Sequence, residues 1–253
     1  MQRDDIGVIL VGGMRSHQEN YAAAFAEEKC RLLAVALADD MTAEDEMRHR
    51  ALAEHWNIPL LSLPDALRLP GAKVASIAVP MPHRAATIAA CANAGMHLYL
   101  DKPLAGTLRD AASIADAVSR AGVTAQIFSH VTAGWAQRAR SAIQDGRLGR
   151  IVAVHADMLM AKGQPTQVPS RVRAESPEPA DFPEDVAKRE MTDMGAYPLS
   201  LIAWLLGSRC EAVNAATANH FFAEHLERDV EDYGAMLLRF EHNVLATLTC
   251  GRS

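Results

Sequence analysis

Short apolar runs alternate with stretches of helical periodicity along the first half of the chain. Each run is continuous, which is typical of strands buried on both faces of a sheet. The predicted strands are Ile6–Val11, Leu32–Leu37, Val74–Val79, His97–Leu100 and Val123–Phe128. The predicted helices cover residues 16–28, 42–54, 83–94 and 107–121, and residues 58–69 are expected to form a loop and a short helix. This order predicts a parallel sheet with right-handed crossovers.

The pattern changes after residue 128. A helix over residues 131–144 and a turn at Gly146 and Gly149 lead into a strand that begins at Ile151. Residues 162–185 are expected to form a long ordered loop or lid, with a disordered insertion as the alternative. A helix over residues 191–206 and strands over 212–222, 230–240 and 244–250 follow, with a hairpin turn at 241–243. We therefore expect a doubly wound parallel domain over residues 1–128 and an α+β domain on a largely antiparallel open sheet over 129–253.

Composition narrows the class of protein. The 253 residues are 49% apolar and 22% charged, as in soluble globular proteins, and the net charge of −6 argues against nucleic-acid binding. No apolar run is long enough to span a bilayer, and the N-terminus lacks a signal-peptide core, so a cytoplasmic protein is expected. The four cysteines are scattered, which indicates reduced thiols and no structural zinc site.

The strand His97–Leu100 ends in Asp101, Lys102 and Pro103. Proline has no amide hydrogen and biases the preceding residue toward an extended conformation, so Lys102 is held at the carboxyl end of the strand. Ligands bind at that edge of open α/β sheets. A lysine there is a candidate for chemistry; the alternative is a structural cation paired with a neighbouring acid.

The N-terminal strand, glycine turn and helix have the outline of a dinucleotide-binding unit. The glycine pattern is incomplete, because Leu10 or Val11 stands at the first glycine position and Arg15 near the third. Backbone at Gly12 and Gly13 allows a pyrophosphate to approach, and the Arg15 guanidinium is able to bind phosphate. Asp39 is a candidate for the adenosine ribose, with a solvated loop acid as the alternative. Pro80 and His83 follow another strand and are expected to line the cofactor site together with Asp101 and Lys102.

Two motifs and two further stretches of the chain resemble, in their order along the sequence, those of one protein family. The run Gly95–Ala105 resembles the "GKHV-x-x-EKP" signature of the glucose–fructose oxidoreductase, inositol dehydrogenase and MocA (Gfo/Idh/MocA) family, with Asp101 in place of the usual Glu. Asp193–Pro198 is similar to the family's "D-x-G-x-H/Y" motif, residues 143–151 to its link between domains, and residues 230–234 to a strand start in its sheet.

The resemblance implies a Rossmann domain followed by an α/β domain whose open sheet is often used for oligomer contacts, so a homo-oligomer is expected. It implies hydride transfer between NAD or NADP and a sugar, inositol or related polyol. Lys102 corresponds to the motif lysine near nicotinamide and substrate, Asp193 to a residue that orients substrate, and Tyr197 to the position of a catalytic histidine or tyrosine. The chain stops before several strands that the family normally has, so a fragment or a shortened member is expected.

Removal of hydride from a secondary alcohol needs a base for the hydroxyl proton. A free tyrosine has a pKa near ~10, which a neighbouring ammonium lowers, so Tyr197 beside Lys102 is a candidate acid/base pair. The alternative is a tyrosine packed against the sheet. His155, Lys162 and Arg189 are candidate substrate contacts, with a structural histidine and a solvated charged loop as the alternatives.

Three functions stay open at this point. The first is the dehydrogenase. The second is a hydrolase or epimerase that recycles its cofactor on the same scaffold. The third is a non-catalytic protein with a degraded nucleotide site.

Overall fold

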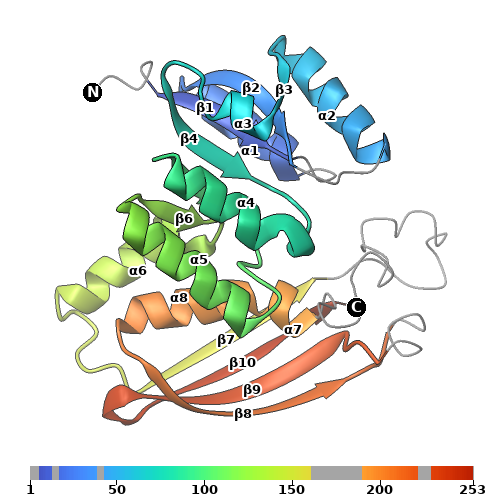
Figure 1. The fold of residues 1–253 in the computed structure, drawn as a ribbon. Coiled ribbons are helices and arrows are strands. Elements are labelled where there is room, and N and C mark those ends of the chain that lie inside the picture. Colours follow the sequence, from blue (N-terminus) through green and yellow to red (C-terminus); the bar gives the residue numbers. More distant parts are fainter. Residues whose placement is uncertain (1–5, 13–16, 39–42, 161–189, 222–228, 253) are drawn as a thin grey trace. The chain divides into compact units, whose positions relative to one another are not determined.

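The computed structural model describes residues 6–12, 17–38, 43–160, 190–221 and 229–252. The chain divides into two compact units, Met1–Phe128 and Ser129–Ser253, each with its own sheet (Figure 1). None of the helices in the described parts of the chain is long and apolar enough to cross a membrane.

Within its described residues, the first unit has a six-stranded sheet in the order β3-β2-β1-β4-β5-β6, and each neighbouring pair is parallel. The strand order reverses between β1 and β4, and a crevice forms at such a switch point beyond the carboxyl ends of the strands. The strands are β1 (Gly7–Val11), β2 (Arg31–Leu37), β3 (Leu60–Ser62), β4 (Ala72–Ile77), β5 (His97–Leu100) and β6 (Ala125–Ile127).

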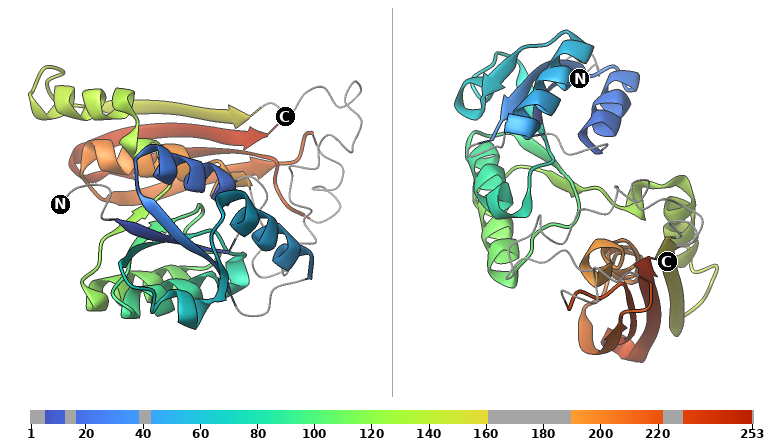
Figure 2. Two further views of the ribbon diagram at one scale, coloured as in Figure 1. Left: turned by 90° about the horizontal axis from the view of Figure 1, so that it is seen from above. Right: turned by 90° about the vertical axis from the view of Figure 1, so that its right-hand side faces the viewer.

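Helices cover both faces of this sheet, because alternate residues of the buried strand β1 point to opposite sides. Val8 and Leu10 belong to a core shared with α1 (His17–Glu27) and α2 (Ala43–Trp56). Ile9 and Val11 belong to a second core shared with α3 (Leu63–Ala66), α4 (Met81–Asn93) and α5 (Leu108–Ala121). The helices α4 and α5 run side by side (Figures 1 and 2). The predicted doubly wound parallel sheet is confirmed.

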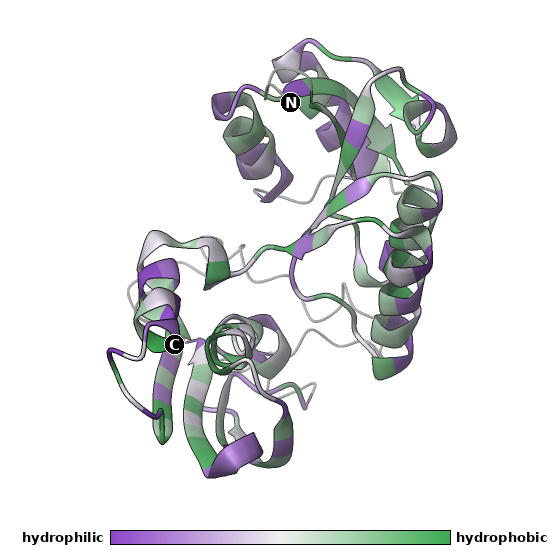
Figure 3. Ribbon diagram, turned by 90° about the vertical axis from the view of Figure 1, so that its left-hand side faces the viewer, coloured by the Kyte–Doolittle hydropathy of each residue, from purple (hydrophilic) through white to green (hydrophobic). Residues whose placement is uncertain are grey.

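In the described part of the second unit, four strands form a sheet in the order β7-β10-β9-β8. The β7–β10 pair is parallel, and the β10–β9 and β9–β8 pairs are antiparallel. Buried and exposed residues largely alternate along β7, β9 and β10 (Figure 3), so one face of these strands packs against α8 (Ala196–Leu206) and the other stays open, whereas β8 is exposed along most of its length. The remaining elements are a 3-10 turn at His130–Thr132, α6 (Gly134–Gln144), β7 (Ala153–Met160), α7 (Glu190–Asp193), β8 (Cys210–Ala218), β9 (Tyr233–Phe240) and β10 (Val244–Arg252).

Two details differ from the sequence predictions, and a third prediction falls on residues that the structure does not describe. Leu60–Ser62 forms the edge strand β3, where a loop was expected, and three residues are too few for a periodic signal. The helix predicted over 191–206 is broken into α7 and α8 at Met194 and Gly195. A Cβ on Gly195 would lie 2.2 Å from the Met191 carbonyl oxygen, so the break depends on glycine. The loop or lid predicted over 162–185 lies outside the described residues.

Candidate functional site

Three adjacent strands of the first sheet bring together the described residues that were predicted to bind a cofactor. Gly12 directly follows β1, Pro80 follows β4 and precedes α4, and Lys102 follows β5. His83 lies in the first turn of α4 and is half-buried. Because the strands are parallel, these residues share the carboxyl edge of the sheet, and Lys102 is only 8% exposed.

Gly12 occupies a position that another residue could not take without strain. Its φ is +71°, and an added Cβ would lie 2.5 Å from Val79 Cγ1 and 2.9 Å from the Ala78 carbonyl oxygen. The end of β1 therefore passes very close to the segment after β4. The incomplete glycine motif was expected to provide a close backbone approach of this kind at Gly12.

The carboxylate of Asp101 points into the protein. It is 2% exposed, accepts a hydrogen bond from the Tyr21 hydroxyl at 2.7 Å and one from the backbone N–H of Lys102 at 2.9 Å, and contacts His17 Nδ1 at 3.1 Å. Burial alone would raise the pKa of Asp101, but hydrogen bonding and charge from His17, helped by Arg84 and Tyr21, outweigh it, so this pKa is lowered. Asp101 was predicted to bind cofactor, and the structure gives its carboxylate protein partners.

Arg84 lies beneath the same loop and was not singled out in the sequence. Its guanidinium is buried, donates to the Val79 carbonyl oxygen at 2.9 and 3.2 Å, and contacts the Asp101 carbonyl oxygen at 3.5 Å. It also donates to the carbonyl oxygen of Pro103, which follows a cis peptide bond. One side chain of α4 therefore bridges the ends of β4 and β5.

The start of α1 is fixed to the sheet by a second buried contact. Gln18 Nε2 donates to the Ser76 carbonyl oxygen at 2.9 Å, and the Ser76 hydroxyl donates to Gln18 Oε1 at 3.1 Å. Both side chains are fully buried. Together with the Asp101 contacts of His17 and Tyr21, this pair ties α1 to two neighbouring strands.

In the second unit, Tyr197 lies in the first turn of α8 and is buried. Its ring stacks on that of His130, with centroids 4.8 Å apart and planes 19° apart. His130 also meets Trp135 edge-on at 6.0 Å. The candidate acid/base therefore has an imidazole against one face of its phenol.

Asp193 belongs to a buried ionic cluster. Arg252 at the end of β10 binds Glu190 at 2.8 Å and also pairs with Asp193, which is 1% exposed. Burial alone would lower the pKa of Arg252, but the charges of Glu190 and Asp193 outweigh it and raise the pKa. The acid predicted to orient substrate thus has an arginine partner that joins α7 to β10.

His155 lies on the open face of the second sheet. Its neighbours Val154 and Ala156 pack against the core under α8, whereas His155 is exposed and contacts Thr247 and Asp157. The structure does not bring His155 together with Tyr197 or Asp193. The predicted residues Gly13, Arg15, Asp39, Lys162 and Arg189 lie outside the described residues.

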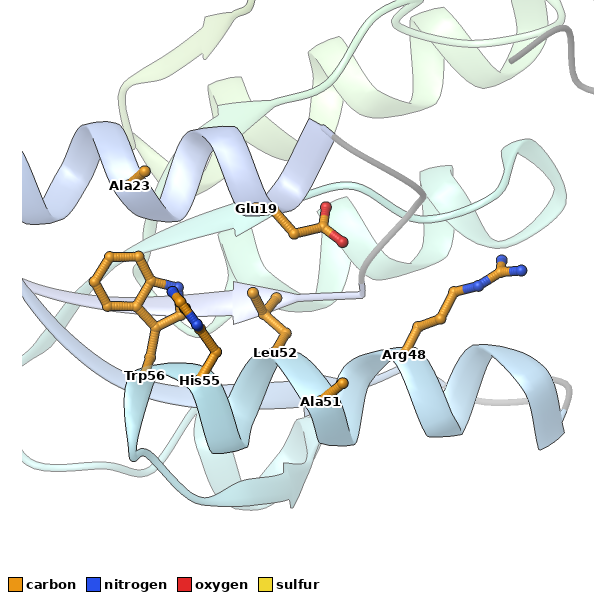
Figure 4. Close-up of a pocket in the computed structure, with 7 residues that line it drawn as sticks. All are labelled: Glu19, Ala23, Arg48, Ala51, Leu52, His55 and Trp56. Atoms are coloured by element: carbon orange, nitrogen blue, oxygen red, sulfur yellow. The ribbon is translucent and has the colours of Figure 1, made fainter. Parts of the chain in front are cut away.

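A pocket of about 390 Å³ lies between α1 and α2. Glu19 and Arg48 lie toward one end of it and His55 and Trp56 toward the other (Figure 4). Among the described residues, none of those predicted to form the cofactor or substrate site lines this pocket.

Residues 6–129 match the NAD-binding Rossmann fold of the Gfo/Idh/MocA oxidoreductase family, and residues 136–253 match the family's C-terminal domain. The chain belongs to this family. The predicted family and the predicted NAD-binding Rossmann domain are thereby confirmed.

Among curated proteins, a 72-residue segment is 44% identical to the 1,5-anhydro-D-fructose reductase of Ensifer adhaerens, and it covers 28% of this chain but only 21% of that protein. Among solved structures, the scyllo-inositol dehydrogenase of Lactobacillus casei with NAD(H) and scyllo-inositol has a TM-score of 0.76 and 15% identity, covering 98% of this chain and 69% of that one. The WlbA dehydrogenase of Bordetella pertussis with NADH and UDP-GlcNAcA has a TM-score of 0.75 and 22% identity, covering 97% and 66%. These likenesses establish the fold.

The residues present fit a nicotinamide dinucleotide. The tight backbone at Gly12 leaves no side chain at the end of β1, which is where a pyrophosphate must come close to the backbone. Lys102, Pro80 and the half-buried His83 lie at the same edge.

Sequence reasoning missed the residues that support the site. Arg84, His17 and Arg252 carried no motif, and their contacts join elements far apart in the chain. The spacing of His17 and Tyr21, four residues apart on one helix, was an available signal, because such residues share a helix face.

Proposed function

We propose that this chain is an NAD(P)-dependent oxidoreductase that transfers hydride to or from a secondary hydroxyl of a sugar, inositol or related polyol. The observation that carries the proposal is the buried Lys102 at the carboxyl edge of the sheet, the same edge at which Gly12 allows a close backbone approach. When bound, the nicotinamide would accept or donate the hydride. The names of the relatives support the substrate class, since they include inositol dehydrogenases and a sugar reductase.

In the oxidation direction, the substrate hydroxyl loses its proton as the carbon-bound hydrogen leaves with its electron pair. We assign the proton to Tyr197 and the stabilisation of the developing alkoxide to the Lys102 ammonium. The ring of His130 against Tyr197 limits the directions in which the phenol can turn.

Asp193 has a positioning role in this proposal. Its ion pair with Arg252 fixes the junction of α7 and α8, and Tyr197 lies four residues further along. Lys162 and Arg189 stay predicted substrate contacts. We leave His155 out of the substrate site because it lies on the opposite face of its sheet from α8.

The choice between NAD and NADP depends on Asp39 and Arg15. An acid at the end of the second strand suits the ribose hydroxyls of NAD, and an arginine suits the phosphate of NADP. Gly13 is proposed to extend the backbone approach begun by Gly12.

The open face of the second sheet is proposed as the surface through which the protein forms a homo-oligomer. It exposes Leu159, Leu237 and Leu245 to solvent, at 57%, 48% and 47%. Burying these exposed leucine side chains would stabilise an assembly. All four cysteines are free thiols, which is consistent with a reducing compartment such as the cytoplasm.

The test has two parts. Native mass spectrometry of the purified protein would reveal a carried nucleotide, and absorbance of the reduced nicotinamide would report turnover with a panel of inositols, sugars and polyols. Lys102→Met should abolish turnover while circular dichroism and the thermal melt stay unchanged. Full activity of this variant would overturn the assignment.

The recycling hydrolase or epimerase gives a different outcome. It would retain its nucleotide and release product with no net reduction, and Lys102→Met would stop product formation all the same. A protein that binds neither NAD nor NADP in calorimetry would be non-catalytic.

A further inference from the structure

We propose that His17, Tyr21 and Arg84 are positioning residues for Lys102, which they fix through Asp101 and through the peptide groups on either side of the lysine. The inference rests on the proposed function, because it gives these residues a part in the chemistry assigned to Lys102. They come from α1 and α4, which pack on opposite faces of the first sheet.

The first half of this support acts through the Asp101 carboxylate. Oδ1 accepts two hydrogen bonds, from the Tyr21 hydroxyl at 2.7 Å and from the Lys102 backbone N–H at 2.9 Å. His17 Nδ1 lies 3.1 Å from Oδ2 and 3.2 Å from Oδ1, so it contacts both oxygens. With both oxygens engaged, the carboxylate cannot rotate, so the N–H of Lys102 has a fixed direction.

The second half acts on the carbonyl groups. The Arg84 guanidinium contacts the carbonyl oxygens of Asp101 and Pro103, the residues before and after Lys102. Its other donors bind the Val79 carbonyl oxygen, which belongs to the segment after β4. A planar fork of donors can bridge these positions at once, whereas an ammonium acts as a point charge.

The two halves hold the lysine backbone from opposite sides of the sheet. The Cα end of the Lys102 side chain is therefore fixed, so the ammonium can occupy fewer positions. Placement within a fraction of an ångström matters for catalysis, since a misplaced group loses rate even when the fold is intact.

The side-chain length of the acid at position 101 determines whether these hydrogen bonds can form. A short acidic side chain can accept a hydrogen bond from the backbone N–H of the next residue without a change in the backbone conformation. The usual residue of the family motif, glutamate, is one methylene longer and would carry the carboxylate past this N–H or into Tyr21. We therefore expect the change to the family's usual residue, Asp101→Glu, to be harmful in this chain.

The activity test compares two tyrosines that lie edge to face with ring centroids 5.1 Å apart. Tyr21→Phe removes one hydrogen bond to a buried carboxylate and should lower kcat about tenfold, with KM changed less than about twofold. Tyr99→Phe is the matched control, because no hydrogen bond of its hydroxyl occurs among the described residues, and its kcat should stay unchanged. Asp101→Asn, which keeps the shape of the acceptor, should retain more activity than Asp101→Glu.

A second measurement does not depend on turnover. Acetylation of individual lysines by acetic anhydride, followed by mass spectrometry, reports how accessible each ammonium is. Tyr21→Phe and Arg84→Lys should raise the acetylation rate of Lys102 by about tenfold while exposed Lys29 stays constant. Tyr99→Phe should change neither rate.

The outcomes separate the two proposals. An unchanged kcat and an unchanged Lys102 acetylation rate in Tyr21→Phe would overturn the positioning role. Absence of hydride transfer by the parent protein with every substrate and cofactor would overturn the proposed function, and the acetylation rates would still decide whether Lys102 is positioned as we infer.

Discussion

At the end of β5 and at the junction of α7 with α8, a buried aspartate is held by different kinds of partner. Each contains a buried aspartate close in sequence to a proposed catalytic residue: Asp101 precedes Lys102, and Asp193 lies one helical turn before Tyr197. The partners of Asp101 are a tyrosine, a histidine and a backbone N–H, whereas Asp193 is paired with an arginine. The first network is built mainly from hydrogen bonds, and the second from full charges.

Because of this difference, the two regions are expected to lose different amounts of stability when one partner is replaced. Removing one partner of a buried ion pair leaves an uncompensated charge, which is costly. Removing one hydrogen bond from a carboxylate that keeps two others costs less. The second unit should therefore lose more stability from a single substitution, and the first should respond more to pH.

The largest effect is expected at Arg252. Arg252→Met removes the guanidinium that pairs with both buried acids, Glu190 and Asp193, and should cost about 3–5 kcal/mol in the free energy of unfolding. Urea denaturation followed by the fluorescence of Trp135 and Trp204, both in the second unit, measures it. Arg239→Met is the control, because its pair with Glu211 is exposed and should contribute no more than about 1 kcal/mol. Equal losses in the two variants would contradict the comparison.

A smaller effect is expected at Gln18 in the first unit. Gln18→Leu removes two buried hydrogen bonds to Ser76 and leaves both Ser76 groups without those partners, which should cost about 2–3 kcal/mol. Adding Ser76→Ala removes one stranded hydroxyl, so the double variant should be less unstable than the sum of the single ones. Urea denaturation followed by Trp56 fluorescence, in the first unit, would measure all three. Strict additivity would show that the two side chains do not act as a pair.

The two regions also differ in what the sequence revealed. The strand His97–Leu100 and the position of Lys102 at its end followed from an apolar run and a proline, both local signals. The broken helix at Gly195 was missed, because the close approach of the Met191 carbonyl is a property of the folded backbone. Arg84 and Arg252 could not be found for the same reason: each contacts residues from other elements, and no spacing encodes those contacts.

The pH dependence of the first region is carried by Asp101. Its pKa is lowered in the folded protein, so it contributes stability above its ordinary value near ~3.9 that is lost as pH falls through the folded pKa. Asp101→Asn should therefore be less stable than the parent at neutral pH, by about 1–2 kcal/mol, and the gap should close below roughly pH 4. Asp145→Asn, at an exposed site, is the control and should show no such closing. A gap that stays constant with pH would remove the carboxylate charge from the explanation.

The smallest effect is expected at His49, a second group of the first unit whose protonation is linked to unfolding. Its contribution to the pH dependence can be measured apart from that of Asp101. His49 is fully buried in α2, its Nδ1 contacts the Asp45 carbonyl oxygen, and its Nε2 has no hydrogen-bond partner among the described residues. Burial lowers the pKa of His49, against smaller opposing contributions from Asp45 and Glu19, so the unfolded chain binds the proton more tightly. Stability from this group is complete above the ordinary value near ~6.5 and falls as pH drops below it.

His49→Leu should consequently lie within about 1 kcal/mol of the parent at roughly pH 8 and gain on it at roughly pH 5.5, where Asp101 is still ionised. His55→Leu, on the exposed side of the same helix, should leave the pH slope unchanged. Urea denaturation at the two pH values, followed by Trp56, measures both variants. If His49→Leu and the parent lose stability in parallel between these values, the buried imidazole does not titrate on unfolding. The acid sensitivity of the first unit would then come from groups other than His49, among them the Asp101 network.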